Sequence, residues 1–236
     1  MRKIIQYTFL SLLIAVCAGT VFTSATETTH GVSLMQEQTA QTIKLSDPRL
    51  DSDMSIEEAL LKRRSTRKYR GTPLTSAEVS QLLWAAQGMT DPRGFRTAPS
   101  AGALYPLEVY LVAGSVDGIP AGIYRYISQR HEIANRVQGD KRAELRDAAL
   151  GQEQIKQAAA VVVISAFPER TTGKYRDRGI RYVHMEAGHA AQNVYLQATA
   201  LGLGTVVIGA FNDDAIRKIL QMPDREQPLY LMPVGR

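Results

Sequence analysis

The chain has 236 residues, 44% of them hydrophobic and 22% charged, which is enough to bury the core of one large domain or two small ones. Its formal net charge of +5 suits an anionic ligand and is too weak to indicate nucleic-acid binding. Since the only cysteine is Cys17, near the N-terminus, the folded part has no disulfide framework, cysteine-based metal site or cysteine nucleophile.

The first 25 residues have the layout of an export signal. Arg2 and Lys3 precede a mostly apolar run at 4–16 that is too short for an easy membrane span, and small residues end at Ala25. Cys17 offers a lipoprotein interpretation, although the residue before it is not small, as a lipobox requires. Cleavage after Ala25, a lipid anchor on Cys17 and a retained anchor all stay open. Each predicts an exported protein, periplasmic or extracytoplasmic.

Residues 26–46 are polar and lack a sustained apolar period, so we expect a linker there. One domain is predicted over residues 47–236. Its helices are expected to begin at the capping boxes Ser55/Glu58 and Thr75/Glu78 and to include 181–201 and 214–220. Its strands are expected at 107–113, 122–127, 160–166, 205–208 and 229–234. This order lacks regular βαβ alternation, which predicts an α+β fold.

A basic cluster follows the first predicted helix. Arg63-Arg64-Ser65-Thr66-Arg67 places several guanidinium groups and a hydroxyl within one turn. This combination suits a phosphate and its neighbouring polyol. Taken alone, the run is more typical of a solvated helix end, because cations favour a helix C-terminus.

Two further clusters contain small residues. In 98–106, prolines bracket small side chains that would let a flat ring approach the backbone, although an ordinary loop explains the segment equally well. In 202–211, a helix stop, a strand and a turn precede a helix that Asn212 or Asp213 caps. Neither cluster identifies a ligand by itself.

The histidines do not indicate a metal site. Glu186 and His189 form a Glu-x-x-His pair, but a di-iron bundle needs two such pairs and two further glutamates. His184 and His189 are five residues apart, which does not place them on one helix face at metal spacing. We expect both histidines on a helix surface or an interface, and Tyr105, Tyr182 and Tyr195 mainly as packing residues.

Taken in order, these motifs resemble the FMN-dependent nitroreductase family. Arg-Arg-Ser-Thr-Arg is followed by Pro-Ser-Ala-Gly-Ala-Leu-Tyr-Pro, by Gly-His-Ala-Ala-Gln-Asn at 188–193, and by Gly-Leu-Gly-Thr and Ile-Gly-Ala-Phe. No single motif is specific, but four in register cover essentially the whole 47–236 domain. Within the family, the chain is most similar to the SagB-type dehydrogenases, which oxidise azoline rings in peptides.

The resemblance implies an intertwined homodimer with a mixed, mostly antiparallel sheet flanked by helices. It implies one FMN at each of two subunit interfaces and NAD(P)H as the electron donor. The implied phosphate, ribityl and pyrimidine contacts are Arg63, Ser65 and Arg67, assisted by Arg64. The implied ring contacts are Pro99, Ser100 and Ala101 from the second subunit, the side chains of Val207 and Ile208, and the backbone of Gly209 and Ala210 near N5. Gln152 is a weaker implied contact, and Arg236 stands where the family has a basic C-terminal segment.

Lys174 and Tyr175 are the candidate acid–base pair. Azoline dehydrogenases carry a Lys-Tyr pair at the matching place, and a general acid or base is useful in half-reactions that move protons. The polar segment 171–178 is equally consistent with a mobile, charged loop.

Three functions remain open. The first is NAD(P)H-linked reduction of nitro, quinone-like or related small acceptors. The second is oxidation of an azoline ring in a modified peptide, and the third is flavin binding without turnover. The expected partners are a second copy of the chain and a small molecule or modified peptide. Nucleic acid is not expected, and a membrane is expected only through a retained N-terminal anchor.

Overall fold

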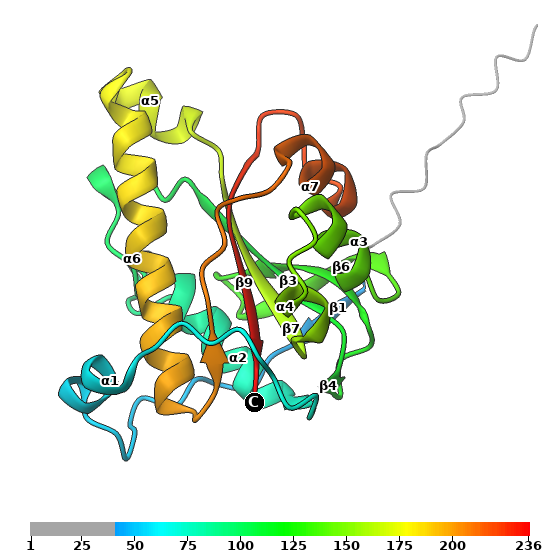
Figure 1. Ribbon diagram of the computed structural model, residues 1–236. Coiled ribbons are helices and arrows are strands. Elements are labelled where there is room, and N and C mark those ends of the chain that lie inside the picture. The colour runs from blue at the N-terminus through cyan, green and yellow to red at the C-terminus, as the bar shows by residue number, and fades with distance from the viewer. Residues whose placement is uncertain (1–40) are drawn as a thin grey trace, which may run out of the picture. The chain divides into compact units, whose positions relative to one another are not determined.

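The computed structural model describes residues 41–236 (Figure 1). The expected export signal and most of the expected linker lie outside the described residues, so the alternatives at Cys17 and Ala25 remain predictions. Of the described helices, none is both long enough and apolar enough to cross a membrane.

A seven-stranded sheet forms the centre of the domain, and its neighbouring strands are all antiparallel. Its strand order is β1-β6-β5-β3-β7-β9-β8. The strands are β1 (Thr42–Lys44), β3 (Leu107–Ala113), β5 (Gly122–Ile127), β6 (Glu132–Gln138), β7 (Ala160–Ala166), β8 (Gly204–Thr205) and β9 (Gln227–Gly235). A separate parallel pair joins β2 (Leu74–Thr75) to β4 (Val116–Asp117). The predicted α+β fold with a mostly antiparallel sheet is confirmed.

Three of the seven described helices begin at side-chain caps that the sequence predicts. The helices are α1 (Ile56–Lys62), α2 (Ser76–Gln87), α3 (Arg142–Ala148), α4 (Gln154–Gln157), α5 (Glu169–Tyr175), α6 (Arg178–Ala200) and α7 (Asp213–Leu220), with a 3-10 turn, η1, at Ala101–Ala103. Thr75 and Glu78 form the complete capping box of α2, and Ser55 accepts a hydrogen bond from the backbone N–H of Glu58. Asn212 caps α7.

Helices cover both faces of the sheet. In β3, Val109 and Leu111 pack on the side of α2 and α6, whereas Tyr110 and Val112 pack on the side of α3, α4 and α7. This follows from the alternation of side chains along a strand. Every residue of β3 and β7 is buried, which explains the continuous apolar run at 160–166. In Figure 1, the long helix α6 lies beside the sheet, on the left of the view.

Three predicted segments have a different structure from the one expected. β1 lies inside the expected linker and pairs with β6, because Ile43 packs against the core while its neighbours face outward. The expected loop at 171–178 is largely helical, since α5 buries Thr171 and packs on α6. The strand expected at 205–208 is reduced to β8 and one isolated bridge between Ile208 and Leu231. The elements β6, α3 and α4 have no counterpart among the predictions.

Candidate functional site

The basic cluster lies beside β8. Residues 63–67 leave α1 in an extended conformation, and the backbone N–H of Thr66 donates to the carbonyl of Thr205 at 2.9 Å. Ser65 forms a parallel bridge with Thr205. Gly204 permits this approach, because a Cβ there would lie 2.6 Å from the Thr66 side chain. The contact brings the predicted phosphate grip next to the segment 204–211, which is distant in sequence.

Tyr195 of α6 connects these two segments. Its hydroxyl lies 3.0 Å from Ser65 Oγ and accepts a hydrogen bond from the backbone N–H of Val207 at 2.8 Å. The Arg63 guanidinium lies over the Tyr195 ring, 5.0 Å from its centroid. The sequence predicts Tyr195 only as a packing residue, because both of its hydrogen-bonding partners are supplied by the tertiary fold.

The four predicted residues of the basic cluster have different surroundings. Arg64 donates to the carbonyls of Leu61 and Arg63 at 2.9 and 2.8 Å, so this side chain caps the end of α1. Arg63 is half-buried, whereas Ser65 and Arg67 are exposed beside β8. Arg64 therefore acts as a helix-end residue. Arg63, Ser65 and Arg67 remain candidates for binding an anion.

The segment 207–210 presents mainly backbone. The Ile208 side chain is 4% exposed and belongs to the core, so of the two predicted ring-face side chains only Val207 stays accessible. Gly209 and Ala210 are exposed. Gln152 lies against this segment, because its Nε2 donates to the Ala210 carbonyl at 3.0 Å.

Arg236 has other partners. Its guanidinium donates to the carbonyl of Pro73 at 2.7 Å and forms an ion pair with Glu78. It therefore connects the end of β9 to the first turn of α2. In this arrangement the charge of Arg236 is already paired with Glu78.

The candidate acid–base pair lies against the loop at 98–106. Gly102 has a φ of +64°, and a Cβ there would lie 2.9 Å from the Tyr175 hydroxyl and 3.1 Å from Lys174 Nζ. Lys174 is exposed and Tyr175 half-buried. The Tyr175 ring packs edge-on against Tyr182 of α6, with a centroid separation of 5.1 Å. The fold thus brings the predicted acid–base pair onto the loop that contains Pro99, Ser100 and Ala101.

The two groups of candidate residues lie far apart within one chain. Tyr195 contacts the basic cluster, whereas Tyr182 contacts the acid–base pair. At about 1.5 Å of rise per residue, these two tyrosines are separated by about 20 Å along α6. Within one chain, the two groups of candidate residues therefore lie at different ends of α6.

A buried polar cluster lies beneath the loop. Glu186 of α6 is 2% exposed, and burial raises its pKa to about 7, against the opposing effects of Ser100, Arg96 and Gln87. Glu186 Oε1, Arg96 Nε and Gln87 Nε2 lack hydrogen-bond partners. Orphaned buried polar atoms are uncommon in native proteins and mark a place where water or a ligand binds.

Metal binding finds no support in the described part of the chain. No group of three or more His, Cys, Asp or Glu side chains there could hold a metal ion. His184 and His189 are both exposed on α6, where the sequence predicts them.

Comparison with known proteins identifies the family. The model of the nitroreductase family matches residues 60–236. The chain belongs to the nitroreductase family. A Methanocaldococcus jannaschii protein provisionally named a nitroreductase is 54% identical over 184 residues, 78% of this chain and 92% of that protein. The protein is therefore an oxidoreductase of a flavin-linked family, as the motifs predict.

Two further relatives define its place in the family. A crystal structure from Ralstonia eutropha, provisionally described as a nitroreductase, superposes with a TM-score of 0.73 at 29% identity and covers 84% of this chain and 90% of that one. The microcin B17-processing protein McbC of Escherichia coli is 28% identical over 158 residues, 64% of this chain. The match spans 58% of McbC. The homologues thus include nitroreductases and a protein like the SagB-type dehydrogenases.

Proposed function

We propose that the protein binds FMN and reduces nitro, quinone-like or related small acceptors with electrons from NAD(P)H. The observation that carries this proposal is the contact of Tyr195 with Ser65 and Val207, which joins the basic cluster to an exposed stretch of backbone. The donor set suits FMN. Guanidinium groups match a phosphate, a hydroxyl matches the ribityl chain, and backbone groups without bulky side chains match a flat ring.

The chain's own residues would bind and orient the flavin. When bound, FMN would supply the hydride and electron chemistry, which the protein does not need to provide. Arg63 and Arg67 would neutralise the phosphate, while Tyr195 fixes the relative position of Ser65 and Val207. Gly209 and Ala210 would leave the reactive edge open to a substrate because neither has a large side chain.

A homodimer accounts for the separation of the two groups of residues. Along α6 they are about 20 Å apart in one subunit. The loop with Pro99, Ser100 and Ala101 would therefore complete the flavin site of a second subunit. This arrangement would also bring Lys174 and Tyr175 to that partner's flavin.

A second candidate function is oxidation of a ring in a modified peptide. The proximity of Lys174 and Tyr175 to Gly102 supports it, because the proposed proton-transfer pair would then lie beside the loop at 98–106 that is proposed to reach a flavin. Similarity to a microcin-processing protein favours it as well. In this function Lys174 and Tyr175 would move the substrate's proton, and reduction of acceptors would be a side activity.

We also propose that residues 1–25 direct export of the chain. The basic start and the short apolar run support this proposal. Mass spectrometry of the protein from its native membrane and soluble fractions tests it. A cleaved form starting at Thr26, a lipidated form starting at Cys17 or an intact form in the membrane fraction agrees with export, and an intact chain in the cytoplasm contradicts it.

The test of function has two steps. First, the purified protein is denatured and the released flavin is chromatographed, with FMN expected; release of FAD, or failure to take up FMN on reconstitution, contradicts the cofactor. Second, turnover is measured with NADH or NADPH against nitroaromatics, quinones and azoline-containing peptides. Consumption of NAD(P)H with nitro or quinone acceptors supports the reductase, and azoline oxidation alone supports the second candidate. An FMN-loaded protein inactive with all of them would be a binding protein.

A further inference from the structure

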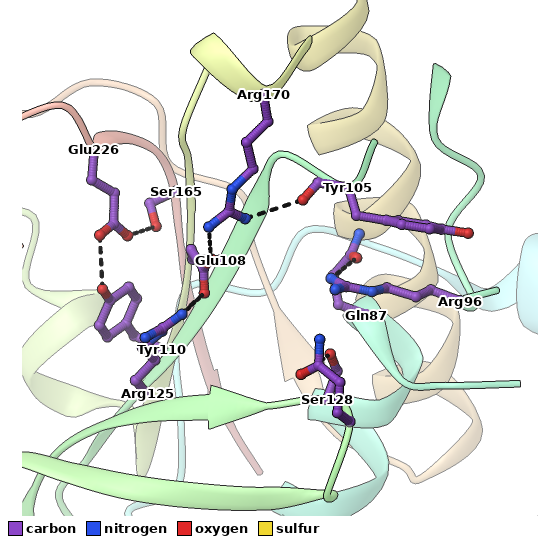
Figure 2. A network of polar contacts seen from close by, with 11 residues as sticks. Gln87, Arg96, Tyr105, Glu108, Tyr110, Arg125, Ser128, Ser165, Arg170 and Glu226 are labelled. Atoms are coloured by element: carbon purple, nitrogen blue, oxygen red, sulfur yellow. Dashed lines mark hydrogen bonds and ion pairs between the residues drawn. The ribbon is translucent and has the colours of Figure 1, made fainter. Parts of the chain in front are cut away.

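A cavity of about 320 Å³ lies behind the loop at 98–106 (Figure 2). Its walls come from the end of α2, from β3 and β5, and from the first turn of α5. Three arginines line it, Arg96, Arg125 and Arg170, together with one carboxylate, Glu108. None of its lining residues belongs to the segments 63–67 or 207–210, so this cavity is separate from the proposed phosphate grip.

Glu108 holds two of the arginines in place. Its Oε2 accepts from Arg125 Nε at 2.9 Å and from Nη2 at 2.8 Å, while its Oε1 accepts from Arg170 Nη2 at 2.7 Å. The Glu108 side chain is 9% exposed. One carboxylate therefore balances two guanidinium groups, and a positive charge is left over. Figure 2 shows both arginines directed at Glu108 from different elements.

Arg96 forms no ion pair with a described carboxylate. Its Nη1 donates to the Gln87 side-chain carbonyl at 3.0 Å, its guanidinium lies 4.6 Å from the centroid of the Tyr105 ring, and its Nε has no hydrogen-bond partner. Each guanidinium has five N–H donors, and protein acceptors engage only one or two of them at each of the three arginines. The side chains of Arg125 and Arg170 stay about two-fifths exposed, whereas Arg96 Nε is buried without a partner, which favours an acceptor inside the cavity.

Two other carboxyl groups border the arginines. Glu186 lies near Arg96, and Glu226 lies behind Glu108, where it accepts hydrogen bonds from Tyr110 and Ser165. Burial raises the pKa of both groups, that of Glu186 to about 7. Neither group lines the cavity, where three arginines face the single carboxylate of Glu108.

We propose that this arginine-lined cavity binds an oxyanion, the carboxylate or phosphate of a small molecule. Planar guanidinium forks match both groups with paired hydrogen bonds. Arg96 supplies a guanidinium group that forms no ion pair with any carboxylate in residues 41–236. Ser128 and Gln129, which also line the cavity, supply neutral hydrogen-bonding groups beside it.

The test is calorimetric titration of the full chain, loaded with FMN and freed of excess flavin, with sodium phosphate and separately with sodium acetate. Sodium chloride keeps the ionic strength constant. We expect saturable binding of at least one anion, weakened about tenfold or more by Arg96→Gln. Arg93→Gln is the matched control, because Arg93 is an exposed arginine paired with Asp91, outside the cavity. It should change the affinity less than about twofold.

A second variant keeps the test decisive if Arg96→Gln fails to fold. Gln129→Glu adds a negative charge at the exposed edge of the cavity and leaves every arginine in place, so it should also weaken anion binding. Binding of phosphate alone or acetate alone identifies the class of ligand. Absence of saturable binding to wild type, or unchanged affinity in the variant that folds, overturns the proposal. Flavin content, read from absorbance, reports separately on the proposed cofactor.

Discussion

Glu186 lies inside the protein, on the face of α6 that packs beneath the loop at 98–106. Its carboxyl is close to Ser100, Gln87 and Arg96, yet one of its oxygens has no hydrogen-bond partner. Partial satisfaction of this kind makes the ionised form costly, because a buried charge without full hydrogen bonding loses its hydration. The protonation state of this residue therefore contributes to stability.

Replacing Glu186 by Gln should change how stability depends on pH. Burial raises the pKa of Glu186 from 4.5 to about 7, so the folded state keeps a proton that the unfolded state releases over this range. The protonated carboxyl contributes fully to the free energy of unfolding below about pH 4.5, and this contribution is lost as the pH rises through 7. Glutamine does not titrate, so the free energy of unfolding of Glu186→Gln should gain on that of wild type as the pH rises. Between pH 5 and pH 8, this gain should be about 1–3 kcal/mol. Urea unfolding at both pH values measures this, and a pH-independent difference would contradict it.

Lys174→Ala and Tyr175→Phe should slow the substrate half-reaction by roughly 10²–10⁴-fold, because each removes a group that can move a proton. Flavin content and reduction by NAD(P)H should not change. Stopped-flow absorbance follows the two half-reactions separately, with Lys156→Ala on α4 as a control for an exposed lysine elsewhere. Gly102→Ala should act in the same direction, since its Cβ would meet both side chains. If the flavin is reoxidised at the wild-type rate in Lys174→Ala, Tyr175→Phe and Gly102→Ala, with every accepted substrate, the pair has no catalytic role.

At the scale of elements, α6 positions both groups of candidate residues. Tyr195 near its end holds the basic cluster, and Tyr182 near its start packs on α5. The side chains of this helix therefore determine how the two parts of the site are placed.

Tyr195→Phe should weaken FMN binding by about tenfold, the usual consequence of losing a hydrogen bond and leaving a partner unsatisfied. It removes the hydroxyl that contacts Ser65 and the Val207 N–H but keeps the ring beneath Arg63. Tyr182→Phe on the same helix is the control, and should leave the affinity within about twofold. Fluorescence titration of flavin-free protein with FMN measures both. Equal affinities in the two variants would mean that Tyr195 only packs.

The central strands could be predicted to the residue. β3, β5 and β7 have the predicted bounds, because β7 is an almost continuous apolar run and β3 and β5 are rich in β-branched and aromatic residues. By contrast, α5 contains two threonines and a glycine, which favour helix weakly, and its packing on α6 is a tertiary effect. β6 pairs with both β5 and β1. It was not predicted because its polar residues interrupt the hydrophobic pattern of a strand.

In the candidate site too, some residues could be predicted from the sequence and others could not. The basic cluster and the loop at 98–106 could be found from residue types and motif order. Tyr195 and Glu186 could not be assigned their places, because their partners come from other elements. The pairing of Arg236 with Glu78 was hidden for the same reason.

At the scale of the whole molecule, flavin binding and assembly should be coupled. If the loop at 99–101 completes the site of a partner subunit, a monomer holds FMN weakly. Multi-angle light scattering should show a dimer, and serial dilution should release flavin over the same concentration range as it releases subunits. Fluorescence of released FMN measures the first quantity and sedimentation velocity the second. A monodisperse monomer that retains its flavin would rule out a shared site.

The position of β9, between β7 and the edge strand β8, affects how the chain completes its sheet. β7 pairs with β3 on one side and with β9 on the other, and β9 is translated long after both. Until residues 227–235 emerge from the ribosome, β7 has an open edge of unpaired N–H and C=O groups between two apolar faces, which is a template for aggregation. The chain therefore cannot complete its sheet in the order of its sequence, because the last strand covers the open edge of β7.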